Sequence, residues 1–190
     1  MVVCYDMSMA ELWQLYDEQS DPLNGKGASR EDSFSQGLLH GASHVWIWRK
    51  GVKDKEILLQ LRAADKRTWP NLLDISAAGH IDLGETPEVA AIRETQEEVG
   101  FDVSPGLLQL IGKHRFKITI DNGVTENEFR WIYLLEIRSE TTFMLQASEV
   151  ASIQWVPLRV FRRNVLPNNG DYVPQGDDYF QLLLSALDAN

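Results

Sequence analysis

The chain has 190 residues, of which 44% are hydrophobic and 24% charged, and this is enough for one domain with a buried core. Its formal net charge of -10 and the lack of a basic tract argue against nucleic acid as a partner, and an anionic substrate would need a metal ion and local Lys or Arg to approach. The single Cys4 excludes an internal disulfide, and we expect a cytoplasmic protein with neither a signal peptide nor a membrane partner.

The N-terminal part is expected to form an extension, residues 1–36, that packs on a main domain over residues 37–190. Ala10–Tyr16 mixes apolar and polar residues and predicts a short strand. Residues 17–27 are rich in Asp, Ser, Pro, Asn and Gly and predict a turn with a loose return. Ser29–Gly37 is polar, and we interpret it as a connector.

Two further strands are predicted next. His44–Trp48 and Glu56–Arg62 contain the aromatic and branched residues that strands favour, and Lys50–Asp54 supplies the turn between them. A loop over Ala63–Asn71 then leads to a strand over Leu72–Ser76, which delivers the chain to a glycine turn.

The stretch Gly79–Phe101, GHIDLGETPEVAAIRETQEEVGF, combines that glycine turn with a helix. Thr86 suits the N-cap, and Pro87 suits the first helical position, where no backbone donor is needed. Good helix formers continue until Gly100, which indicates the C-terminal end. One face of this helix is expected to dock on the core through Val89, Ile92 and Val99.

The same helix carries a row of carboxylates. Glu94, Glu97 and Glu98 stand at positions i, i+3 and i+4, so they share one face. Like charges at this spacing destabilise a helix, and a hard divalent cation such as Mg²⁺, which prefers oxygen ligands, removes that penalty. For such a helix taken alone, a solvated acidic face is the alternative interpretation.

The C-terminal part alternates strands and helices, and Asn122-Gly123 between two apolar runs is a strong hairpin signal. The predicted elements are strands over Leu107–Ile120, Glu126–Ile137 and Ala151–Val156, a helix over Leu158–Asn164, a loop over Val165–Gln175 and a helix over Tyr179–Leu187. Strands on both sides of one central helix predict an α/β architecture with a mixed sheet between helices.

The region of the central helix resembles the Nudix hydrolase family. The positions that define the Nudix box are occupied by Gly79, Glu85, Arg93-Glu94, Glu97-Glu98 and Gly100-Phe101. Thr95 departs from the pattern, because the family usually has an aliphatic residue there. The resemblance implies an α/β/α sandwich with a mixed β-sheet. It also implies a Mg²⁺ ion, with Mn²⁺ as the alternative, held by Glu94, Glu97, Glu98 and the backbone carbonyl of Gly79.

A wider resemblance, from about Ala10 to Trp155, is to the type 1 isopentenyl-diphosphate isomerases and the Nudix hydrolases closest to them. It is carried by Trp69-Pro70, Ala78-Gly79-His80, Glu126-Asn127-Glu128 and Trp155. The isomerases have their catalytic cysteine where this chain has Ala78, and they tend to lose most box carboxylates. Their metal ligands are matched here by His40, His80, Glu126 and Glu128, with Ser33 in place of a further histidine.

Catalytic roles are expected for Glu97 and Glu98, and for one carboxylate of a second pair. Glu126 and Glu128 alternate by two, so they face the same side of a strand. If that side faces the metal, we expect Glu126 to be a further ligand and Glu128 to be the general base. An exposed pair on a sheet edge is the alternative.

Substrate binding is expected from His80 beside the glycine turn and from Arg62 and Lys66. As isolated residues, a polar loop histidine and solvated surface charges are the alternatives. Arg93 is expected to pair with Glu85 or a box carboxylate and to hold the helix against the glycine turn. Structural positions are expected for His44 and His114, and Trp69 is assigned to the core, with the wall of a pocket as the alternative.

The resulting prediction is a Mg²⁺-dependent Nudix hydrolase that cleaves a diphosphate linkage, in a nucleoside- or isoprenoid-type substrate, by water attack. The partner would be this small-molecule diphosphate, with no nucleic acid and no membrane, and a homodimer stays open. One alternative is an isopentenyl-diphosphate isomerase, against which Ala78 argues. The other is a non-catalytic diphosphate-binding module, against which the intact box glutamates argue.

Overall fold

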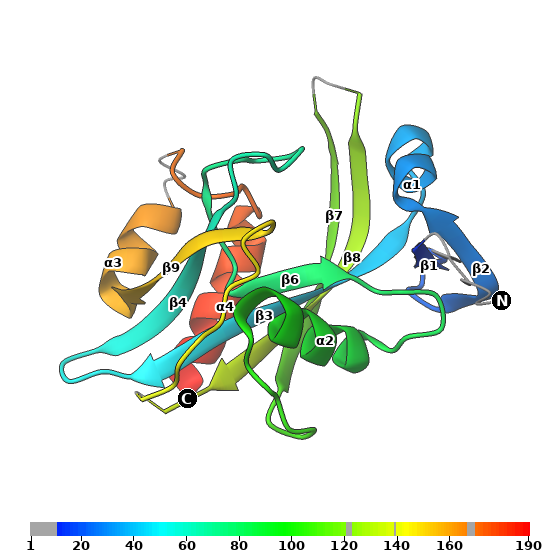
Figure 1. The fold of residues 1–190 in the computed structure, drawn as a ribbon. Helices are drawn as coiled ribbons and strands as arrows, with labels where there is room; N and C mark the ends of the chain where they lie inside the picture. The colour runs from blue at the N-terminus through cyan, green and yellow to red at the C-terminus, as the bar shows by residue number, and fades with distance from the viewer. Residues whose placement is uncertain (1–10, 121–122, 139, 167–169) are drawn as a thin grey trace, which may run out of the picture.

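The computed structural model describes residues 11–120, 123–138, 140–166 and 170–190. Its strands build one sheet, with α2 in front of it and α4 behind it in the view of Figure 1. In chain order the elements are β1 (Leu12–Tyr16), β2 (Pro22–Ser29), α1 (Arg30–Gln36), β3 (His40–Lys50), β4 (Lys55–Arg62), β5 (Leu73–Asp74), β6 (Ala77–His80), α2 (Pro87–Val99), β7 (Gln109–Thr119), β8 (Thr125–Glu136), β9 (Val150–Pro157), α3 (Leu158–Val165) and α4 (Asp177–Ala189).

Strand β3 is the centre of the sheet, and its residues are buried except at its C-terminal end. It pairs in parallel with β8 and antiparallel with β1, β4 and β6. Strand β9 extends the sheet beyond β4, and β7 extends it beyond β8. A strand that is covered on both faces reads as a nearly continuous apolar run, which is why the core of β3 was recognisable in the sequence.

The two faces of β3 serve two separate apolar cores. Val45 and Ile47 point to one face and pack with residues of α2. Trp46 and Trp48 point to the other face and pack with residues of α3 and α4. Successive side chains of a strand alternate between faces, so one strand can support both layers. The predicted α/β/α sandwich with a mixed sheet is confirmed.

Helix α2 begins and ends as predicted. The Thr86 side chain accepts a hydrogen bond from the backbone N–H of Val89, Pro87 opens the helix, and Gly100 ends it in the left-handed region at φ 67°. The prediction that Val89 faces the core is wrong, because its side chain is 50% exposed. The buried apolar residues of α2 are instead Ala90, Ala91 and Val99. Glu98, on the face that carries the glutamates, is buried as well.

The interpretation of Ser29–Gly37 as a connector is wrong, because this segment contains α1. The Ser29 hydroxyl caps the helix by accepting from the Asp32 N–H, and Gly37 ends it at φ 62°. These are the ordinary start and stop signals of a helix, although only two residues between them, Ser33 and Phe34, are buried. Short length and a weak apolar pattern concealed the helix.

The strand predicted over Leu72–Ser76 is shorter, because the chain changes its pairing partner there. Leu73 and Asp74 pair with β4, whereas Ala77–His80 pairs with β3. The switch leaves the residues between them outside both ladders. The other predicted strands and helices are present with small shifts of their ends, and Asp121 and Asn122 of the predicted hairpin turn lie outside the described residues.

Strand β1 joins the N-terminal part to the turn that follows β6. The Gln14 N–H donates to the carbonyl of Ile81 at 2.8 Å, and the Leu83 N–H donates to the carbonyl of Leu12 at 2.7 Å. Residues 11–36 are therefore bonded to the loop that precedes α2, while residues 1–10 lie outside the described part of the chain.

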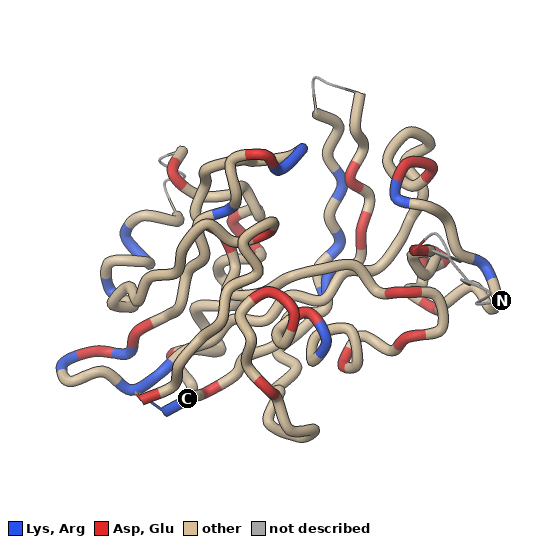
Figure 2. Tube along the Cα trace, viewed as in Figure 1, with Lys and Arg blue, Asp and Glu red and all other residues tan. Residues whose placement is uncertain are grey.

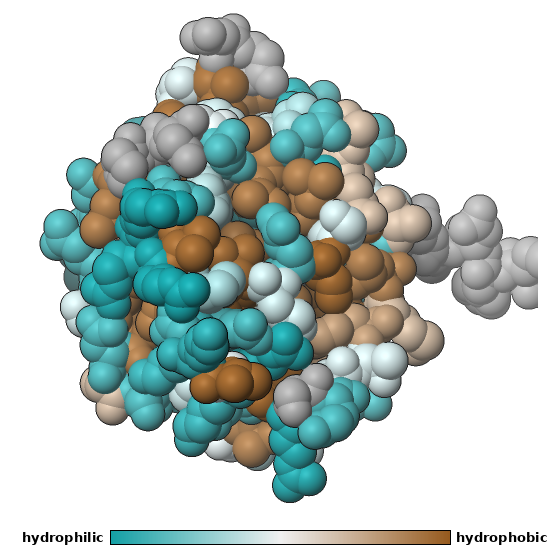
Figure 3. All heavy atoms as spheres, turned by 90° about the vertical axis from the view of Figure 1, so that its left-hand side faces the viewer, coloured by the Kyte–Doolittle hydropathy of each residue, from teal (hydrophilic) through white to brown (hydrophobic). Residues whose placement is uncertain are grey.

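On the side of the molecule that carries α3, hydrophilic and apolar side chains are interspersed (Figure 3). Single exposed apolar residues such as Val52 and Met144 are ordinary for a protein surface. Within the described residues, none of the helices has the length and apolar character needed to cross a membrane.

Candidate functional site

A cleft of about 420 Å³ lies between α2, the sheet and the N-terminal part. Among the carboxylates that line it are those of α2 and β8, on which acidic residues appear in Figure 2. We call the first group, Glu94, Glu97 and Glu98, the helix side, and the group formed by His40, His80, Glu128 and Arg130 the strand side.

On the helix side, the three glutamates differ in burial. Glu98 is buried, Glu94 is half-buried, and Glu97 is exposed at the rim. All three line the same cleft, as their shared helix face predicts. Burial, together with the negative charge of Glu94, raises the pKa of Glu98 to about 8. Burial likewise raises the pKa of Glu94 to about 7, although the neighbouring Arg93 opposes the shift.

Gly79 lies against this carboxylate cluster. A Cβ atom at Gly79 would overlap the carboxylate of Glu94, so only glycine leaves room for that side chain in this position. Two hydrogen bonds hold the Glu98 carboxylate: the Ala78 N–H donates to its Oε2 at 3.0 Å, and Gln60 donates to the same oxygen at 3.4 Å. Strand β6 thus fixes two of the three carboxylates.

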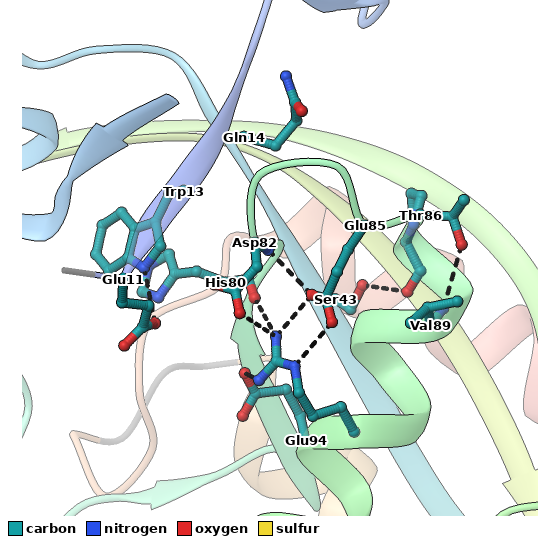
Figure 4. Close-up of polar contacts among 12 residues, drawn as sticks. Glu11, Trp13, Gln14, Ser43, His80, Asp82, Glu85, Thr86, Val89 and Glu94 are labelled. Carbon is teal, nitrogen blue, oxygen red and sulfur yellow. Dashed lines mark hydrogen bonds and ion pairs between the residues drawn. The ribbon is translucent and has the colours of Figure 1, made fainter. Parts of the chain in front are cut away.

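Arg93 ties the helix to β6 and to the turn after it. The prediction of a turn at Gly79 is wrong, because Gly79 lies within β6 and pairs with Ser43. Arg93 Nε and Nη2 donate to the two carboxylate oxygens of Glu85 at 3.0 and 2.9 Å. Nη2 also donates to the carbonyl of His80 at 2.9 Å, and Nη1 donates to Glu94 at 2.6 Å. Figure 4 shows Glu85, Asp82 and the His80 carbonyl gathered around this guanidinium.

On the strand side, Glu128 is enclosed by cationic and polar groups. Its Oε1 lies 3.5 Å from the Nε2 atoms of both His40 and His80, and its Oε2 accepts from Arg130 Nε at 2.7 Å. Burial alone would raise the pKa of Glu128, but Arg130 and the two histidines hold it well below its usual range. Glu128 is therefore a carboxylate anion in this environment.

Glu126 lies on the same face of β8 as Glu128, and both carboxylates are buried and line the cleft. The pair therefore faces the cleft, and the alternative of an exposed pair on a sheet edge is wrong. Burial and the nearby charge of Glu128 raise the pKa of Glu126 to about 7. Arg130 Nη2 lies 3.7 Å from Glu126, while its Nη1 donates to Gln175 at 2.6 Å. Gln175 in turn donates to Asp74 at 3.2 Å.

The two histidines of the strand side are covered by an aromatic ring from β1. Trp13 stacks on His80 with ring centroids 3.5 Å apart and planes 10° apart, and it also contacts His40 (Figure 4 shows Trp13 over His80). One ligand atom each from His40, His80 and Glu128 lies within 4.8 Å of the others, as in a metal site. His40 Nε2 and Ser33 Oγ are buried without a hydrogen-bond partner.

The two predicted substrate-binding cations lie at the cleft but already have carboxylate partners. Arg62 Nη1 pairs with Asp74 at 2.9 Å, and Lys66 pairs with Glu149. Arg62 also donates to the carbonyl of Trp69 at 3.1 Å. The assignment of Trp69 to the core is wrong, because this residue is half-buried, lines the cleft and has a positive φ of 52°.

The NUDIX domain family matches residues 39–175. The chain belongs to the Nudix family. The match begins before β3 and ends at Gln175. It therefore contains the helix side and the strand side of the cleft, but not Trp13 and the other lining residues of the N-terminal part. The prediction that this chain is an enzyme of the Nudix hydrolase family is confirmed.

Curated relatives agree with this placement. Nudix hydrolase 3 of Arabidopsis thaliana is 34% identical over 160 residues, which are 82% of this chain and 20% of that protein. An uncharacterised Nudix hydrolase of Listeria monocytogenes is 34% identical over 86% of this chain and 89% of its own. An isopentenyl-diphosphate Delta-isomerase of Aliivibrio fischeri is 32% identical over 77% of this chain and 80% of its own.

Solved structures share the Nudix fold. DR0079 from Deinococcus radiodurans superposes with a TM-score of 0.66 at 18% identity, over 90% of this chain and 97% of its own. The NUDIX domain of Shewanella oneidensis NrtR, solved in complex with ADP ribose, has a TM-score of 0.56 at 17% identity over 78% of this chain and 86% of its own.

Several residues of this Nudix cleft were not found from the sequence. Arg130 continues the alternation of Glu126 and Glu128 along β8, so the period of two was the available signal. Trp13 and Gln175 reach the cleft from distant parts of the chain, and the sequence held no local signal for them. His44 has the structural position that was predicted, because its Nδ1 lies 2.8 Å from the Tyr179 hydroxyl.

Proposed function

We propose that this chain is a Mg²⁺-dependent hydrolase that cleaves the diphosphate linkage of a small-molecule substrate. The observation that carries the proposal is the convergence of Glu94, Glu97 and Glu98 on one cleft beside Gly79. Three carboxylates in this arrangement repel one another, and burial raises the pKa values of Glu94 and Glu98, in Glu94 against the opposing effect of Arg93. A divalent cation supplies a countercharge.

The donor set fits Mg²⁺. Glu94, Glu97, Glu98 and the Gly79 carbonyl offer only oxygen atoms, which are the ligands this ion prefers. The overlap that any Cβ at Gly79 would make with Glu94 supports a cradle built for a close approach at this point. When bound, the ion neutralises charge on the diphosphate oxygens.

The reaction joins the oxygen of a water molecule to phosphorus and breaks the bond from that phosphorus to the bridging oxygen. The water loses a proton to a carboxylate of the cleft, and the bridging oxygen leaves with its electron pair on the other phosphoryl group. Of the residues expected in this role, Glu98 has the better environment, because its two hydrogen-bond donors, the Ala78 N–H and Gln60, are neutral and bond the same oxygen. Both oxygens of Glu128 already face Arg130 or a histidine, so we assign Glu128 to positioning instead of proton transfer.

Substrate phosphate would be received by the cationic wall across from the helix side. Arg62 and Lys66 line that wall, and their carboxylate partners, Asp74 and Glu149, fix their positions. His80 also lines the cleft, with its Nε2 3.5 Å from Glu128 Oε1. Nudix relatives and neighbours whose names include ADP ribose or isopentenyl diphosphate support a diphosphate in general, of either the nucleoside or the isoprenoid class.

The test is a screen of nucleoside and isoprenyl diphosphates for phosphate release with Mg²⁺, run with and without an added phosphatase. The wild-type chain is expected to turn over at least one substrate, and Glu98→Gln to lower kcat by about 10²-fold or more. Glu88→Gln is the matched control, because Glu88 lies on the same helix but is exposed and outside the cleft. No turnover of any diphosphate by the wild type would contradict the proposal.

An isopentenyl-diphosphate isomerase is the second candidate, favoured by the isomerase relative and by the grouping of His40, His80 and Glu128. A double-bond shift needs a proton donor and a proton acceptor on either side of the substrate, and Ala78 offers no such group. Interconversion of isopentenyl and dimethylallyl diphosphate without release of phosphate would favour this candidate over the hydrolase.

A further inference from the structure

Five lysine and arginine side chains line the cleft, and four of them are neutralised by the protein itself. Each of these four has at least one carboxylate partner in an ion pair. The pairs are Arg62 with Asp74, Lys66 with Glu149, Arg93 with Glu85 and Glu94, and Arg130 with Glu128. The fifth, Arg30, has neither an ion pair nor a hydrogen bond within the part of the chain that the structure describes.

Arg30 is nevertheless held at the cleft. Its guanidinium carbon lies 5.6 Å from the ring centroid of Phe34 and 6.0 Å from that of Trp13. Both rings are buried, and Trp13 is itself fixed by stacking on His80. Cation–π contacts of this kind orient a guanidinium but leave all its N–H donors available.

The charge of Arg30 acts on the same space as that of Lys66. Burial is the main reason why the pKa of Lys66 is lowered, and the positive charges of Arg62 and Arg30 add to the effect. Two cations that line the same cleft and repel each other favour an anion near both of them. The cation–π contacts of Arg30 and its electrostatic effect on Lys66 therefore both place the charge of Arg30 at the cleft.

The wall that carries Arg30 lies outside the part that the family shares. Arg30, Trp13 and Phe34 belong to residues 11–36, whereas the family match begins at residue 39. Residues that shape a cleft from outside the common domain are suited to selecting a substrate, while the common domain carries the chemistry.

We propose that Arg30 binds the terminal phosphoryl group of a diphosphate that is substituted at one end only, an inference that rests on the proposed diphosphate site. Such a group carries a second negative charge and three non-bridging oxygens, and the fork of a guanidinium matches two of these oxygens. A diphosphate that is substituted at both ends lacks this group. The cleft would then prefer singly substituted diphosphates.

The experiment measures binding and needs no turnover. Titration calorimetry with Mg²⁺ compares methylenebisphosphonate, whose P–C–P link resists hydrolysis, with its P,P′-dimethyl ester, which has no doubly ionised end. Arg30→Gln is expected to weaken binding of the free bisphosphonate roughly 10- to 100-fold, as the loss of a charge-assisted hydrogen bond predicts, and to change binding of the diester less than about 2-fold. Arg30→Lys should recover part of the affinity.

Lys26→Gln is the matched control, because Lys26 is an exposed cation of the same N-terminal part that does not line the cleft. Unchanged binding in Arg30→Gln, equal losses for both ligands, an equal loss in Lys26→Gln or no binding by the wild type would each overturn the inference. Thermal unfolding checks that Arg30→Gln is folded. Because hydrolysis is measured separately, failure of the proposed function and failure of this inference give different results.

Discussion

The helix side and the strand side of the cleft both place glutamates in a buried setting, but they balance the charge in opposite ways. On the helix side, Glu98 has no cation within hydrogen-bonding distance, and its pKa is raised to about 8. On the strand side, Glu128 faces Arg130 and two histidines, and its pKa is held well below its usual range. Glu98 therefore has no paired cation among the described residues, whereas Glu128 has Arg130.

This difference separates two tasks that a diphosphate-cleaving site needs. A cluster of oxygens without a countercharge can accept and release a hard metal ion together with substrate. A carboxylate that is enclosed by fixed donors is rigid and stays ionised, so it can shape the cleft without exchanging ligands. Four experiments, from the largest expected effect to the smallest, test whether the two sides differ in this way.

The largest effect is expected for stability on the strand side. Arg130→Met removes the guanidinium between Glu128 and Gln175, and a buried carboxylate left without its partner should cost about 3–5 kcal/mol in the free energy of unfolding. Arg93→Met on the helix side should cost less, because the Arg93 side chain is 25% exposed and water can replace it. Urea unfolding of both variants measures the two losses in the free energy of unfolding. Equal losses would show that Arg130 on the strand side is no more important for stability than Arg93 on the helix side.

The pH dependence of stability should have opposite signs on the two sides. In metal-free protein, Glu98 has a folded pKa of about 8 against an ordinary 4.5, so its contribution is fully present below pH 4.5 and is lost as the pH rises through 8. Glu128 has a lowered folded pKa, so its contribution is present above pH 4.5 and is lost as the pH falls.

Denaturant titrations in a chelator should therefore show stability falling by about 3–5 kcal/mol between pH 4.5 and 8, at roughly 1.4 kcal/mol for each pKa unit. Glu98→Gln should flatten that fall, and so should Mg²⁺. An alkaline limb that neither change affects would show that the helix side does not carry the uncompensated charge.

The third effect concerns geometry on the helix side. Gly79→Ala places a methyl group where the Glu94 carboxylate lies, and because the end of a glutamate side chain is flexible, the carboxylate should move while the fold is kept. We expect kcat to fall about 100-fold, or roughly 2.7 kcal/mol of transition-state stabilisation. In a Glu94→Ala background the same substitution should have little further effect, and additive losses would show that Gly79 acts through something else.

The smallest effect is a change in metal preference. The nitrogen ligands of His40 and His80 suit Zn²⁺ better than Mg²⁺. His40→Gln should weaken Zn²⁺ binding at least tenfold, or about 1.4 kcal/mol, and leave activation by Mg²⁺ intact. His44→Gln is the control, because His44 is another buried histidine of β3 that lies outside the trio. Equal Zn²⁺ affinity in both variants would mean that the strand side is no metal site.

Local signals account for what the sequence predicted well. Helix α2 has its cap, its proline and its terminal glycine within the segment itself, so its ends were readable. Helix α1 has the same kinds of signal at Ser29 and Gly37. Few apolar residues lie between them, and this polar composition favoured the prediction of a connector. The strand predicted over Leu72–Ser76 shows the reverse problem: only Leu73 and Asp74 of it form β5, because the chain then changes its pairing partner, and β6 over Ala77–His80 was not predicted.

The strand side was harder to predict because it depends on register between distant strands. Parallel pairing sets His40 directly opposite Glu128, and β6 sets His80 opposite Ala42, two residues further along β3 and therefore on the same face. No local pattern specifies such a register, so a family resemblance grouped these residues where periodicity alone did not. The contact of Trp13 with His80 and the bond of Gln175 to Arg130 arise in the same way, from chain segments that meet only in the folded protein.

The hydrogen bonds between β1 and the loop before α2 bear on where this protein can be cut. A fragment limited to residues 39–175 would keep every box glutamate, yet it would leave the carbonyl of Ile81 and the N–H of Leu83 without their partners in β1. It would also lose Trp13 from the face of His80, and it would lose α4, whose Leu183 and Leu187 fill the core behind the sheet. The unit by which the family is recognised is therefore smaller than the unit that folds.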